Sequence, residues 1–274
     1  MEEFVKKCVI FYNEDKQTAA VNYKKIKEFL ENEKIEILSA AYIKDADFAV
    51  VIGGDGTLLR ATQKLIKNED IVVIAVNAGS LGFLTEIKAE EGIEACKSYL
   101  SGDYEIDYRG LLDVWINNEK KSVLNEVVFS NGGMARKPVK IGLYSDKGKI
   151  NCYRGDGVII STPTGSTAYS LSAGGPIISH YLDAVLITPI APHNLTTRPI
   201  VIDIKREICV KVEEEPESDR ESFVIADGES WQKISRTDKI KVKYSHKKLK
   251  LLLPKNRNYY SVLKEKLKWG DNLC

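Results

Sequence analysis

The apolar run at residues 50–52 leads into Gly53-Gly54-Asp55-Gly56-Thr57, and a helix-like pattern follows at once. This order is typical of a strand-to-helix connection in an α/β layer. Glycines let the backbone approach a phosphate closely, and the new helix directs its unpaired N–H groups toward the turn. The carboxylate of Asp55 suits accepting a hydroxyl proton or holding a metal ion that bridges phosphates. The segment therefore predicts phosphoryl transfer to an alcohol, with Asp55 beside the acceptor.

The same segment has a purely structural alternative. A tight strand-to-helix turn often needs glycine for steric reasons, and its aspartate can cap the next helix. The segment does not match the GxxxxGK[ST] phosphate loop, because no lysine follows, and it does not match GxGxxG. Both interpretations of Asp55 therefore stay open from these residues alone.

Composition restricts the class of protein. The chain has 274 residues, 43% hydrophobic and 29% charged, which is typical of a globular protein with one large domain or two of ordinary size. A formal net charge of +1 argues against binding to the nucleic-acid backbone, and no apolar run is long enough for a membrane helix. The odd number and scattered spacing of the cysteines favour a reduced, cytoplasmic compartment; they are Cys8, Cys96, Cys152, Cys209 and Cys274.

Hydrophobic patterning divides the chain in two. Apolar runs at 7–12, 48–52 and 71–76 predict buried strands of a parallel sheet, and they alternate with helical patterns, one of them carrying Ala19, Tyr23, Ile26 and Leu30. After Gly102 we expect mostly strands, at 108–116, 121–130, 139–145, 158–161, 201–212, 239–244 and 249–253. Residues 213–221 read as an exposed hairpin loop.

The pattern at Tyr260, Leu263 and Leu267 predicts a last helix that folds back on the first domain. We therefore expect an α/β domain at 1–100, completed by 255–274, and a β-rich domain at 101–254.

Two further glycine-rich segments follow predicted strands. Residues 77–83 contain Gly79 and Gly82, which indicates a turn at the carboxyl end of a parallel strand, where open α/β sheets bind ligands. Phe83 within it either stacks on a base or packs in the core, and the core is the default for such an aromatic. Residues 154–176 concentrate hydroxyls and glycines that can contact a base and a ribose without adding charge. The alternative there is a turn followed by a helix capped by Ser166 or Thr167.

A polar pair, Asn125-Glu126, interrupts the apolar stretch at 123–129. Either both side chains lie at a sheet edge in water, or they line a pocket. In a pocket, the amide of Asn125 suits an adenine edge, and the carboxylate of Glu126 suits ribose hydroxyls. The segment Ala226-Asp227-Gly228-Glu229 is read as a hairpin turn.

Taken together, four segments resemble the motifs of the NAD kinases, in that family's order: 53–57, 77–83, Asn125-Glu126 and 162–169. The resemblance spans nearly the whole chain. The first segment is shared with diacylglycerol-type lipid kinases and phosphofructokinases, and the 162–169 segment distinguishes the NAD kinases from them. The resemblance implies an N-terminal α/β domain, a β-sandwich-like C-terminal domain, and a last helix returning to the first.

The resemblance also implies an activity. An NAD kinase transfers the γ-phosphoryl group of ATP, with Mg²⁺, to the 2′-hydroxyl of the adenosine ribose of NAD, and the aspartate matching Asp55 takes the hydroxyl proton. Family members are usually homodimers or homotetramers, with dinucleotide sites near the subunit contact. We accordingly expect Asp55→Asn to keep NAD binding while lowering turnover about 100-fold or more.

Further site residues follow from the same resemblance. Positions matching Asn125 and Thr167 contact adenine, Phe83 matches a residue beside it, and Glu126, Ala168 and Tyr169 match residues around the ribose. Asp156 and Ser172 match positions toward the nicotinamide end. The expected binding residues are completed by Gly54, Gly56, Thr57, Arg154 and Thr164.

Two alternatives remain from sequence alone. A lipid or sugar kinase would share only the glycine turn and would be indifferent to NAD. A non-catalytic sensor would keep the dinucleotide pocket without turnover, although the intact Asp55 argues against it.

Overall fold

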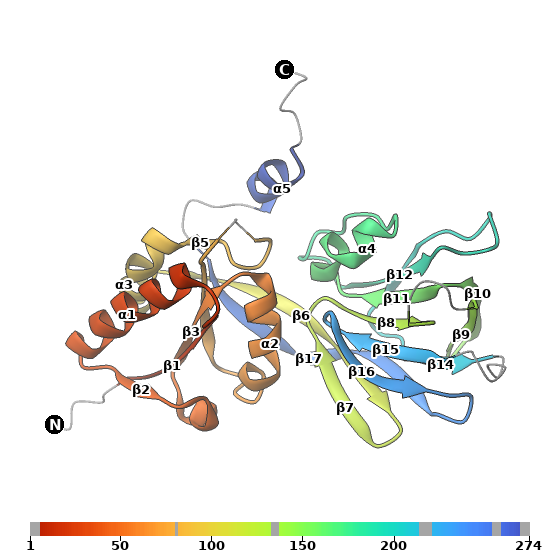
Figure 1. Cartoon of the computed structure of the whole chain (residues 1–274), viewed down its shortest axis with the longest axis horizontal. Coiled ribbons are helices and arrows are strands. Elements are labelled where there is room, and N and C mark those ends of the chain that lie inside the picture. The colour runs from red at the N-terminus through yellow and green to blue at the C-terminus, as the bar shows by residue number, and fades with distance from the viewer. Residues whose placement is uncertain (1–5, 80–81, 133–136, 214–220, 254–258, 269–274) are drawn as a thin grey trace. The chain divides into compact units, whose positions relative to one another are not determined.

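The computed structural model describes residues 6–79, 82–132, 137–213, 221–253 and 259–268 (Figure 1). Its contacts divide the chain into two compact units, Met1–Tyr108 with Lys248–Cys274, and Arg109–Lys247. Residues 248–253, which the sequence grouped with the second domain, are counted in the first unit. None of the helices among the described residues combines the length and apolar content that crossing a bilayer requires.

The first unit is an α/β layer around a parallel sheet. Its strands are β1 (Lys7–Tyr12), β2 (Glu36–Leu38), β3 (Phe48–Gly53), β4 (Val72–Asn77), β5 (Ile87–Lys88) and the end of β17 (Ile240–Leu253). They pair in the order β17-β4-β3-β1-β2, all parallel, and β5 pairs with β4. The helices are α1 (Gln17–Asn32), α2 (Asp55–Leu65), α3 (Gly92–Ser101), α5 (Tyr259–Leu267) and the 3-10 turns η1 (Ala40–Asp45) and η2 (Ala89–Glu91).

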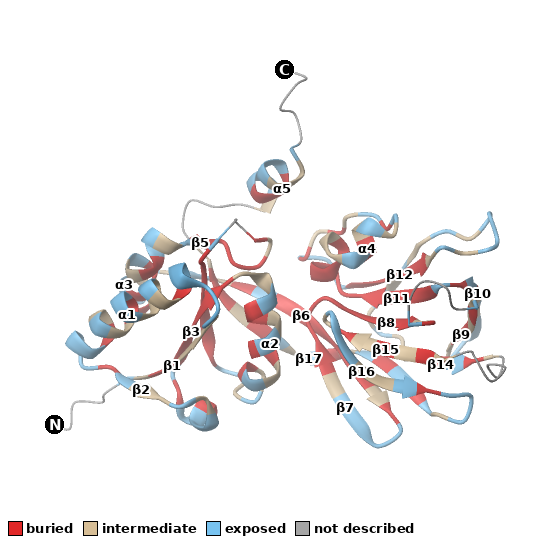
Figure 2. Cartoon of the chain, viewed as in Figure 1, coloured by how far each residue is buried: buried red, intermediate tan, exposed pale blue. Residues whose placement is uncertain are grey.

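Burial explains why the strands and the first helix of this unit could be predicted from the sequence. Every residue of β3 and β4 is buried, as a continuous apolar run in a parallel sheet should be, and β3 is buried along its length in Figure 2. Ala19, Ile26 and Leu30 of α1 are buried, which confirms the predicted stripe. The predicted strand at 7–12 is confirmed as well.

The C-terminal helix returns to the first unit, as predicted. Within α5, Val262 and Leu263 are buried, and the Lys266 ammonium lies 5.9 Å from the centre of the Phe83 ring. Burial of two apolar side chains gives a nine-residue helix the packing that its own propensity does not supply.

The second unit is a sandwich of two antiparallel sheets. One sheet has the order β13-β12-β11-β8-β15-β16, and the other contains β10-β9-β14-β17 together with the β6–β7 hairpin. The strands are β6 (Glu105–Ile116), β7 (Glu119–Val123), β8 (Glu126–Ser130), β9 (Val139–Ser145), β10 (Gly148–Gly155), β11 (Gly157–Ser161), β12 (Ala184–Ile190), β13 (Ile200–Asp203), β14 (Ile208–Val212), β15 (Ser222–Ala226) and β16 (Glu229–Ile234). The turn η3 (Thr164–Thr167) and the short helix α4 (Tyr169–Ser172) follow β11.

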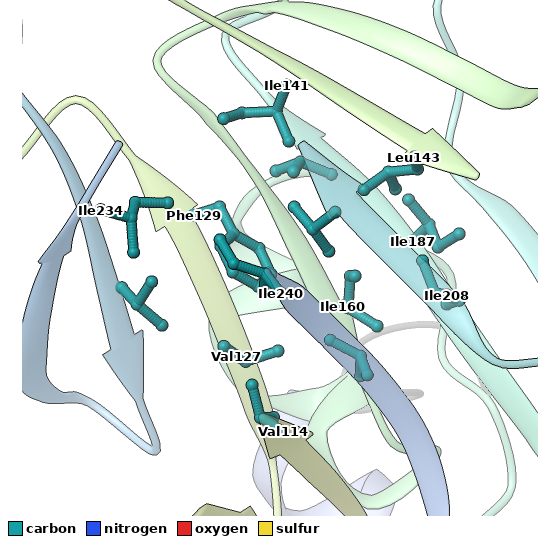
Figure 3. Close-up of a cluster of buried hydrophobic side chains, with 14 of the residues drawn as sticks. Val114, Val127, Phe129, Ile141, Leu143, Ile160, Ile187, Ile208, Ile234 and Ile240 are labelled. Atoms are coloured by element: carbon teal, nitrogen blue, oxygen red, sulfur yellow. The ribbon is translucent and has the colours of Figure 1, made fainter. Parts of the chain in front are cut away.

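Both sheets of this unit contribute to one apolar core. Phe129 and Ile160 come from the first sheet, while Ile141, Ile208 and Ile240 come from the second, and all five are buried (Figure 3). This shared core fixes the predicted β-sandwich-like domain.

Two of the predicted strands are wrong in extent because the chain changes sheet within them. The run at 121–130 is divided into β7, which pairs with β6, and β8, which belongs to the other sheet. The run at 201–212 is divided in the same way into β13 and β14. Apolar alternation continues through such a crossing, so periodicity alone does not reveal it.

The opposite error occurs near the C-terminus. The predicted strands at 239–244 and 249–253 are one strand, β17. Its Ile240 to Val242 portion pairs with β14, and Lys250 and Leu251 pair with β4. The polar residues between them read as a break in the sequence, whereas the backbone continues through them. Of the predicted hairpin loop at 213–221, residues 214–220 lie outside the described residues.

Candidate active site

The glycine turn places Asp55 at the first position of α2, directly after β3. The residue that caps α2 is Gly54, and no side chain caps the helix, so the alternative that Asp55 acts as its cap is wrong. A Cβ on Gly54 would meet nothing within 4 Å, and one on Gly56 would meet only an Arg60 nitrogen at 3.9 Å. The backbone at both glycines is therefore open to close approach by a ligand.

Gly53 differs from the other two glycines of the turn. A Cβ there would lie 2.2 Å from the hydroxyl oxygen of Thr57. Gly53 is needed for packing between β3 and α2, and the buried Thr57 occupies the space that a side chain would take.

The carboxylate of Asp55 is held by the loop at residues 83–85. Its Oδ1 accepts the N–H groups of Leu84 at 3.1 Å and Thr85 at 3.0 Å, and also the Thr85 hydroxyl at 3.0 Å. Within the described residues, its Oδ2 accepts the Phe83 N–H alone, at 2.8 Å. Among the described residues, the two oxygens are therefore unequally occupied, since a carboxylate oxygen has two lone-pair directions.

Further hydrogen bonds support the contact between Asp55 and the loop at 83–85. The Asn77 amide nitrogen donates to the Thr85 hydroxyl at 2.9 Å, and the Asn77 oxygen accepts the Gly79 N–H at 2.7 Å. Gly82 closes the other side, because a Cβ there would lie 1.9 Å from Oδ1 of Asp55. Of the predicted segment at 77–83, Ser80 and Leu81 lie outside the described residues.

Phe83 is half-buried, so its ring is not enclosed as a core side chain would be. Its backbone contacts Asp55, and its ring faces Lys266 of α5.

A cleft of about 480 Å³ opens between the end of β1 and α2. Thr57, Arg60 and Lys64 of α2 line one side, and Glu14 and Asp15 lie on the other. Thr57 lies in the first turn of α2, where the helix dipole adds partial positive charge. The cleft is thus a polar space along one side of α2.

In the second unit, Asn125 and Glu126 lie at the start of β8 and are buried. The sheet-edge alternative is wrong, because β8 lies between β11 and β15 in the sheet. Oε2 of Glu126 is buried and has no hydrogen-bond partner among the described residues. Ser161 of β11 lies opposite Glu126 in the strand register, and its buried hydroxyl also has no hydrogen-bond partner among the described residues. Buried polar atoms without partners are rare, and here they mark a place where a ligand can bond.

Asp227 is the anchor of this segment. Asp227 and Gly228 have φ of 49° and 79° and form the two-residue turn between β15 and β16, so the predicted hairpin is confirmed. The Asp227 carboxylate also accepts the N–H groups of Leu124, Asn125 and Glu126, at 2.8, 2.8 and 3.2 Å. These bonds hold the segment between β7 and β8, and they explain why the apolar run divides there.

Two buried carboxylates therefore lie close together. Burial raises the pKa of Glu126 to about 8; the Asp227 charge adds to the rise, and the Tyr169 N–H opposes it. Burial likewise raises the pKa of Asp227 to about 6, against the effect of the three N–H groups that it accepts. Perturbed carboxyl groups of this kind are typical of ligand sites, although structural networks also produce them.

The hydroxyl-rich segment after β11 is largely occupied with its own structure. The Thr162 hydroxyl donates to the Leu124 carbonyl at 2.6 Å, and the Ser166 hydroxyl donates to the Pro163 carbonyl at 2.6 Å. The Thr167 hydroxyl donates to Thr164, and Ser170 bonds Thr188. These internal hydrogen bonds account for the hydroxyls without the expected direct contact to a base. The capping alternative is also wrong, because α4 is preceded by Ala168 and no side chain caps it.

Packing brings part of this segment against the polar pair. The Thr162 N–H donates to the Asn125 carbonyl at 2.9 Å, and a Cβ on Gly165 would lie 2.1 Å from that same carbonyl oxygen. Thr164 is buried beside this contact, and the Tyr169 N–H reaches Glu126. Tyr169 itself is 45% exposed, so its ring remains accessible to a ligand.

Three predicted residues lie outside these contacts. Arg154 and Asp156, at the end of β10 and after it, are exposed, and Ser172 ends α4 and is exposed. Asp156 accepts a bond from the Asn131 amide at 3.2 Å. No described contact joins these three to Glu126.

Sequence reasoning missed two residues of the site. Thr85 follows the glycine segment without a motif of its own, and Asp227 was read only as a turn residue. Among the described residues, Cys8, Cys96, Cys152 and Cys209 form no disulfide. No group of three metal-binding side chains occurs within the part of the chain that the structure describes.

Both units of the chain match models of known protein families. Residues 10–104 match the family model described as the ATP-NAD kinase N-terminal domain, and residues 124–253 match the ATP-NAD kinase C-terminal domain. The chain is 45% identical over 269 residues to an NAD kinase from Fusobacterium nucleatum, covering 98% of this chain and 99% of the relative. An NAD kinase from Geotalea daltonii is 40% identical over 233 residues, covering 83% and 80%.

Solved structures agree. An NAD kinase from Archaeoglobus fulgidus in complex with ATP superposes with a TM-score of 0.77 at 28% identity, covering 96% of this chain and 98% of that one. A yeast NADH kinase complexed with NADH gives a TM-score of 0.88 at 21% identity, covering 98% and 89%, and supports the fold. The lipid- or sugar-kinase alternative predicts a match confined to the glycine turn, which the match over residues 124–253 contradicts.

Proposed function

The chain belongs to the NAD kinase family, an enzyme family that uses NAD and ATP, and on that premise we propose that Asp55 is the general base. In this proposal, Oδ2 of Asp55 takes the proton of the ribose 2′-hydroxyl as the oxygen attacks the γ-phosphorus of ATP. The oxygen–phosphorus bond to ADP breaks in the same displacement, which gives NADP and ADP. The observation that carries the proposal is that, within the described residues, Oδ2 accepts one N–H group while Oδ1 accepts three donors, which leaves Oδ2 a lone pair for a hydroxyl proton.

Phosphoryl transfer depends mainly on alignment and on neutralising the charge of the transferring group. The open backbone of Gly54 and Gly56 supports placing the ATP phosphates at the start of α2. The cleft lined by Thr57 and Arg60 supports the same placement, because a guanidinium suits phosphate oxygens. If Arg60 contacts the donor, Arg60→Ala raises the KM for ATP and leaves the KM for NAD unchanged.

For the acceptor, we propose that Glu126 binds the adenosine ribose and Asn125 the adenine edge. The buried, unpartnered Oε2 of Glu126 supports this, since a ribose hydroxyl would supply the missing donor. The ring of Tyr169 is exposed, which supports a contact between this ring and the ribose, and Ala168 is proposed beside it. From the resemblance, Thr167 is proposed to contact the adenine. Phe83, a residue of the first unit, is proposed as a further adenine contact. Asp156 and Ser172 are proposed toward the nicotinamide end, and Arg154 and Thr164 complete the set.

Mg²⁺ is proposed to arrive with ATP. The described residues offer no three-ligand cluster for a metal ion, which fits an ion held chiefly by phosphate oxygens rather than by a protein cage. Once bound, Mg²⁺ neutralises phosphate charge during transfer. From the resemblance we also propose a cytoplasmic homodimer or homotetramer.

The test combines product formation with product identity. Purified protein is incubated with NAD, ATP and Mg²⁺, and NADP is measured with an NADP-specific dehydrogenase. We expect NADP with the new phosphate on the 2′-oxygen, which phosphorus NMR distinguishes from the 3′-isomer. NAD binding without any NADP would support the sensor alternative and overturn the proposed mechanism.

A further inference from the structure

A chain of hydrogen bonds runs from Gly79 through Asn77 and Thr85 to Asp55, and it fixes which atom donates in the contact between Thr85 and Asp55. The chain begins at the backbone N–H of Gly79, which can only donate. The Asn77 oxygen accepts it at 2.7 Å, so the amide orientation is set and the Asn77 nitrogen faces Thr85. An amide nitrogen also can only donate, at 2.9 Å here, so the Thr85 oxygen must accept.

The Thr85 hydroxyl has one proton, and its oxygen is already an acceptor for Asn77. Its proton is therefore directed to the remaining neighbour, Oδ1 of Asp55, at 3.0 Å. The Thr85 N–H donates to the same oxygen, also at 3.0 Å. Oδ1 of Asp55 is therefore the acceptor at which this chain of hydrogen bonds ends.

Burial makes the arrangement rigid. Thr85 is fully buried and Asn77 is 3% exposed, so water does not compete for these bonds. The Leu84 N–H adds a third donor to Oδ1, and Gly82 leaves no room for the carboxylate to turn toward it. With three donors on Oδ1 and one on Oδ2 in the part of the chain that the structure describes, the lone pair left for another donor is on Oδ2.

We propose that Thr85 is a positioning residue for phosphoryl transfer, whose hydroxyl and N–H lock Oδ1 of Asp55 so that Oδ2 is presented to the acceptor hydroxyl. This proposal rests on the assignment of Asp55 as the base. In this proposal Thr85 does not touch either substrate, and it acts only through the orientation of the Asp55 carboxylate.

The variant Thr85→Val tests the hydroxyl with little change in shape, and Thr85→Ser restores it. Loss of one hydrogen bond to a charged group predicts a fall in kcat of about tenfold or more for Thr85→Val. The KM for ATP is expected to stay unchanged, and Thr85→Ser is expected to recover kcat to within about threefold, since it restores a bond of that strength. A lowered kcat with an unchanged KM for ATP, recovered in Thr85→Ser, is a result that a general loss of stability would not give.

A matched control separates position from stability. Thr62 is another fully buried threonine of the first unit, and its hydroxyl donates to the Leu58 carbonyl within α2 at 2.9 Å. Thr62→Val removes an equally buried hydroxyl bond, so we expect a comparable loss of thermal stability with kcat unchanged. Calorimetry of NAD binding on each variant verifies that the site still forms.

Asp55→Ala is measured beside them, so that two kinds of failure are distinguished. If Asp55→Ala keeps its turnover, the base assignment fails and the proposal fails with it. If Asp55→Ala is inactive while folded Thr85→Val has unchanged kcat, the proposal for Thr85 alone is overturned. The same conclusion follows if Thr85→Ser does not recover activity, or if Thr62→Val loses as much kcat.

Discussion

Thr85 is bonded twice to the same oxygen of Asp55: its backbone N–H and its hydroxyl both donate to Oδ1, each at 3.0 Å. Thirty residues of sequence separate the two. The carboxylate therefore holds the loop at 83–85 in place, and in the proposed mechanism its Oδ2 also takes the proton of the acceptor hydroxyl. These two roles predict the outcomes of four changes.

The first concerns Asp55→Asn, for which the sequence suggested intact NAD binding. An amide has one oxygen, so its NH₂ group would face either the Phe83 N–H or the three donors on Oδ1. At least one bond to the loop is lost and Phe83 shifts. We now expect the KM for NAD to rise about tenfold or less, the equivalent of one hydrogen bond, in addition to the fall in kcat. An NAD dissociation constant equal to that of the unaltered enzyme, measured by calorimetry, would show that the loop does not depend on the charge.

The second concerns Gly54, where a Cβ meets no protein atom within 4 Å. Its backbone is extended, at φ −102° and ψ −176°, which alanine adopts readily. We expect Gly54→Ala to fold with unchanged thermal stability while its KM for ATP rises several-fold, because the methyl group occupies the space proposed for phosphates. Gly82→Ala is the contrast, since its Cβ would lie 1.9 Å from Asp55 and should lower stability by about 1–3 kcal/mol. An unchanged KM for ATP in Gly54→Ala would contradict the proposal that the ATP phosphates bind at this turn.

The third concerns the pH dependence of stability through Glu126. Its folded pKa of about 8 lies above the ordinary value of 4.5, so the folded state keeps a proton that the unfolded state releases between these values. The contribution of Glu126 to stability therefore falls as the pH rises from 4.5 to 8. Glu126→Gln carries no such charge, and we expect it to be more stable than the unaltered protein by about 1–3 kcal/mol at pH 8, with little difference near pH 4. Denaturant unfolding at several pH values measures this difference.

A suitable comparison is Glu119→Gln, which changes an exposed glutamate at the start of β7. That variant should follow the unaltered protein at every pH. A constant offset for Glu126→Gln, independent of pH, would contradict the burial of an ionisable group at position 126.

The fourth concerns Asp227, which accepts the N–H groups of Leu124, Asn125 and Glu126. Asp227→Ala leaves these three donors without a partner, so we expect a loss of about 1–3 kcal/mol in unfolding free energy. The segment that carries Asn125 and Glu126 also loosens, so NAD should bind more weakly. Asp146→Ala, at an exposed carboxylate that bonds Arg206 in the same unit, should change neither. Unaltered NAD affinity in a folded Asp227→Ala variant would separate this anchor from the dinucleotide site.

Much of the fold is visible in the sequence, for particular reasons. The strands β3 and β4 are continuous apolar runs because both of their faces are buried, and the stripe on α1 repeats at helical spacing because one face packs on the sheet. The β7–β8 break was not visible, since it is imposed by Asp227, about a hundred residues away along the chain. The continuity of β17 through its polar middle was likewise set by strand partners in both units.

The site follows the same division. Asp55 is marked by its glycines, and Asn125-Glu126 by polar residues in an apolar strand, so both stand out locally. Thr85 does not, because an isolated threonine after a glycine segment has no local signature and acquires its role from a carboxylate on another element. Several hydroxyls of the 162–170 segment stand out in the sequence, yet they bond to nearby backbone or to each other.

The most direct test of the central claim measures NADP formation by Asp55→Ala at saturating NAD and ATP, with and without added formate. If the Asp55 carboxylate takes the hydroxyl proton, kcat falls about 100-fold or more, the usual scale for loss of a general base. Formate should then restore part of the rate, because a free carboxylate can enter the space left by the side chain, and chloride at the same ionic strength should not. Turnover within about tenfold of the unaltered enzyme, well short of that scale, would contradict the assignment of Asp55 as the base.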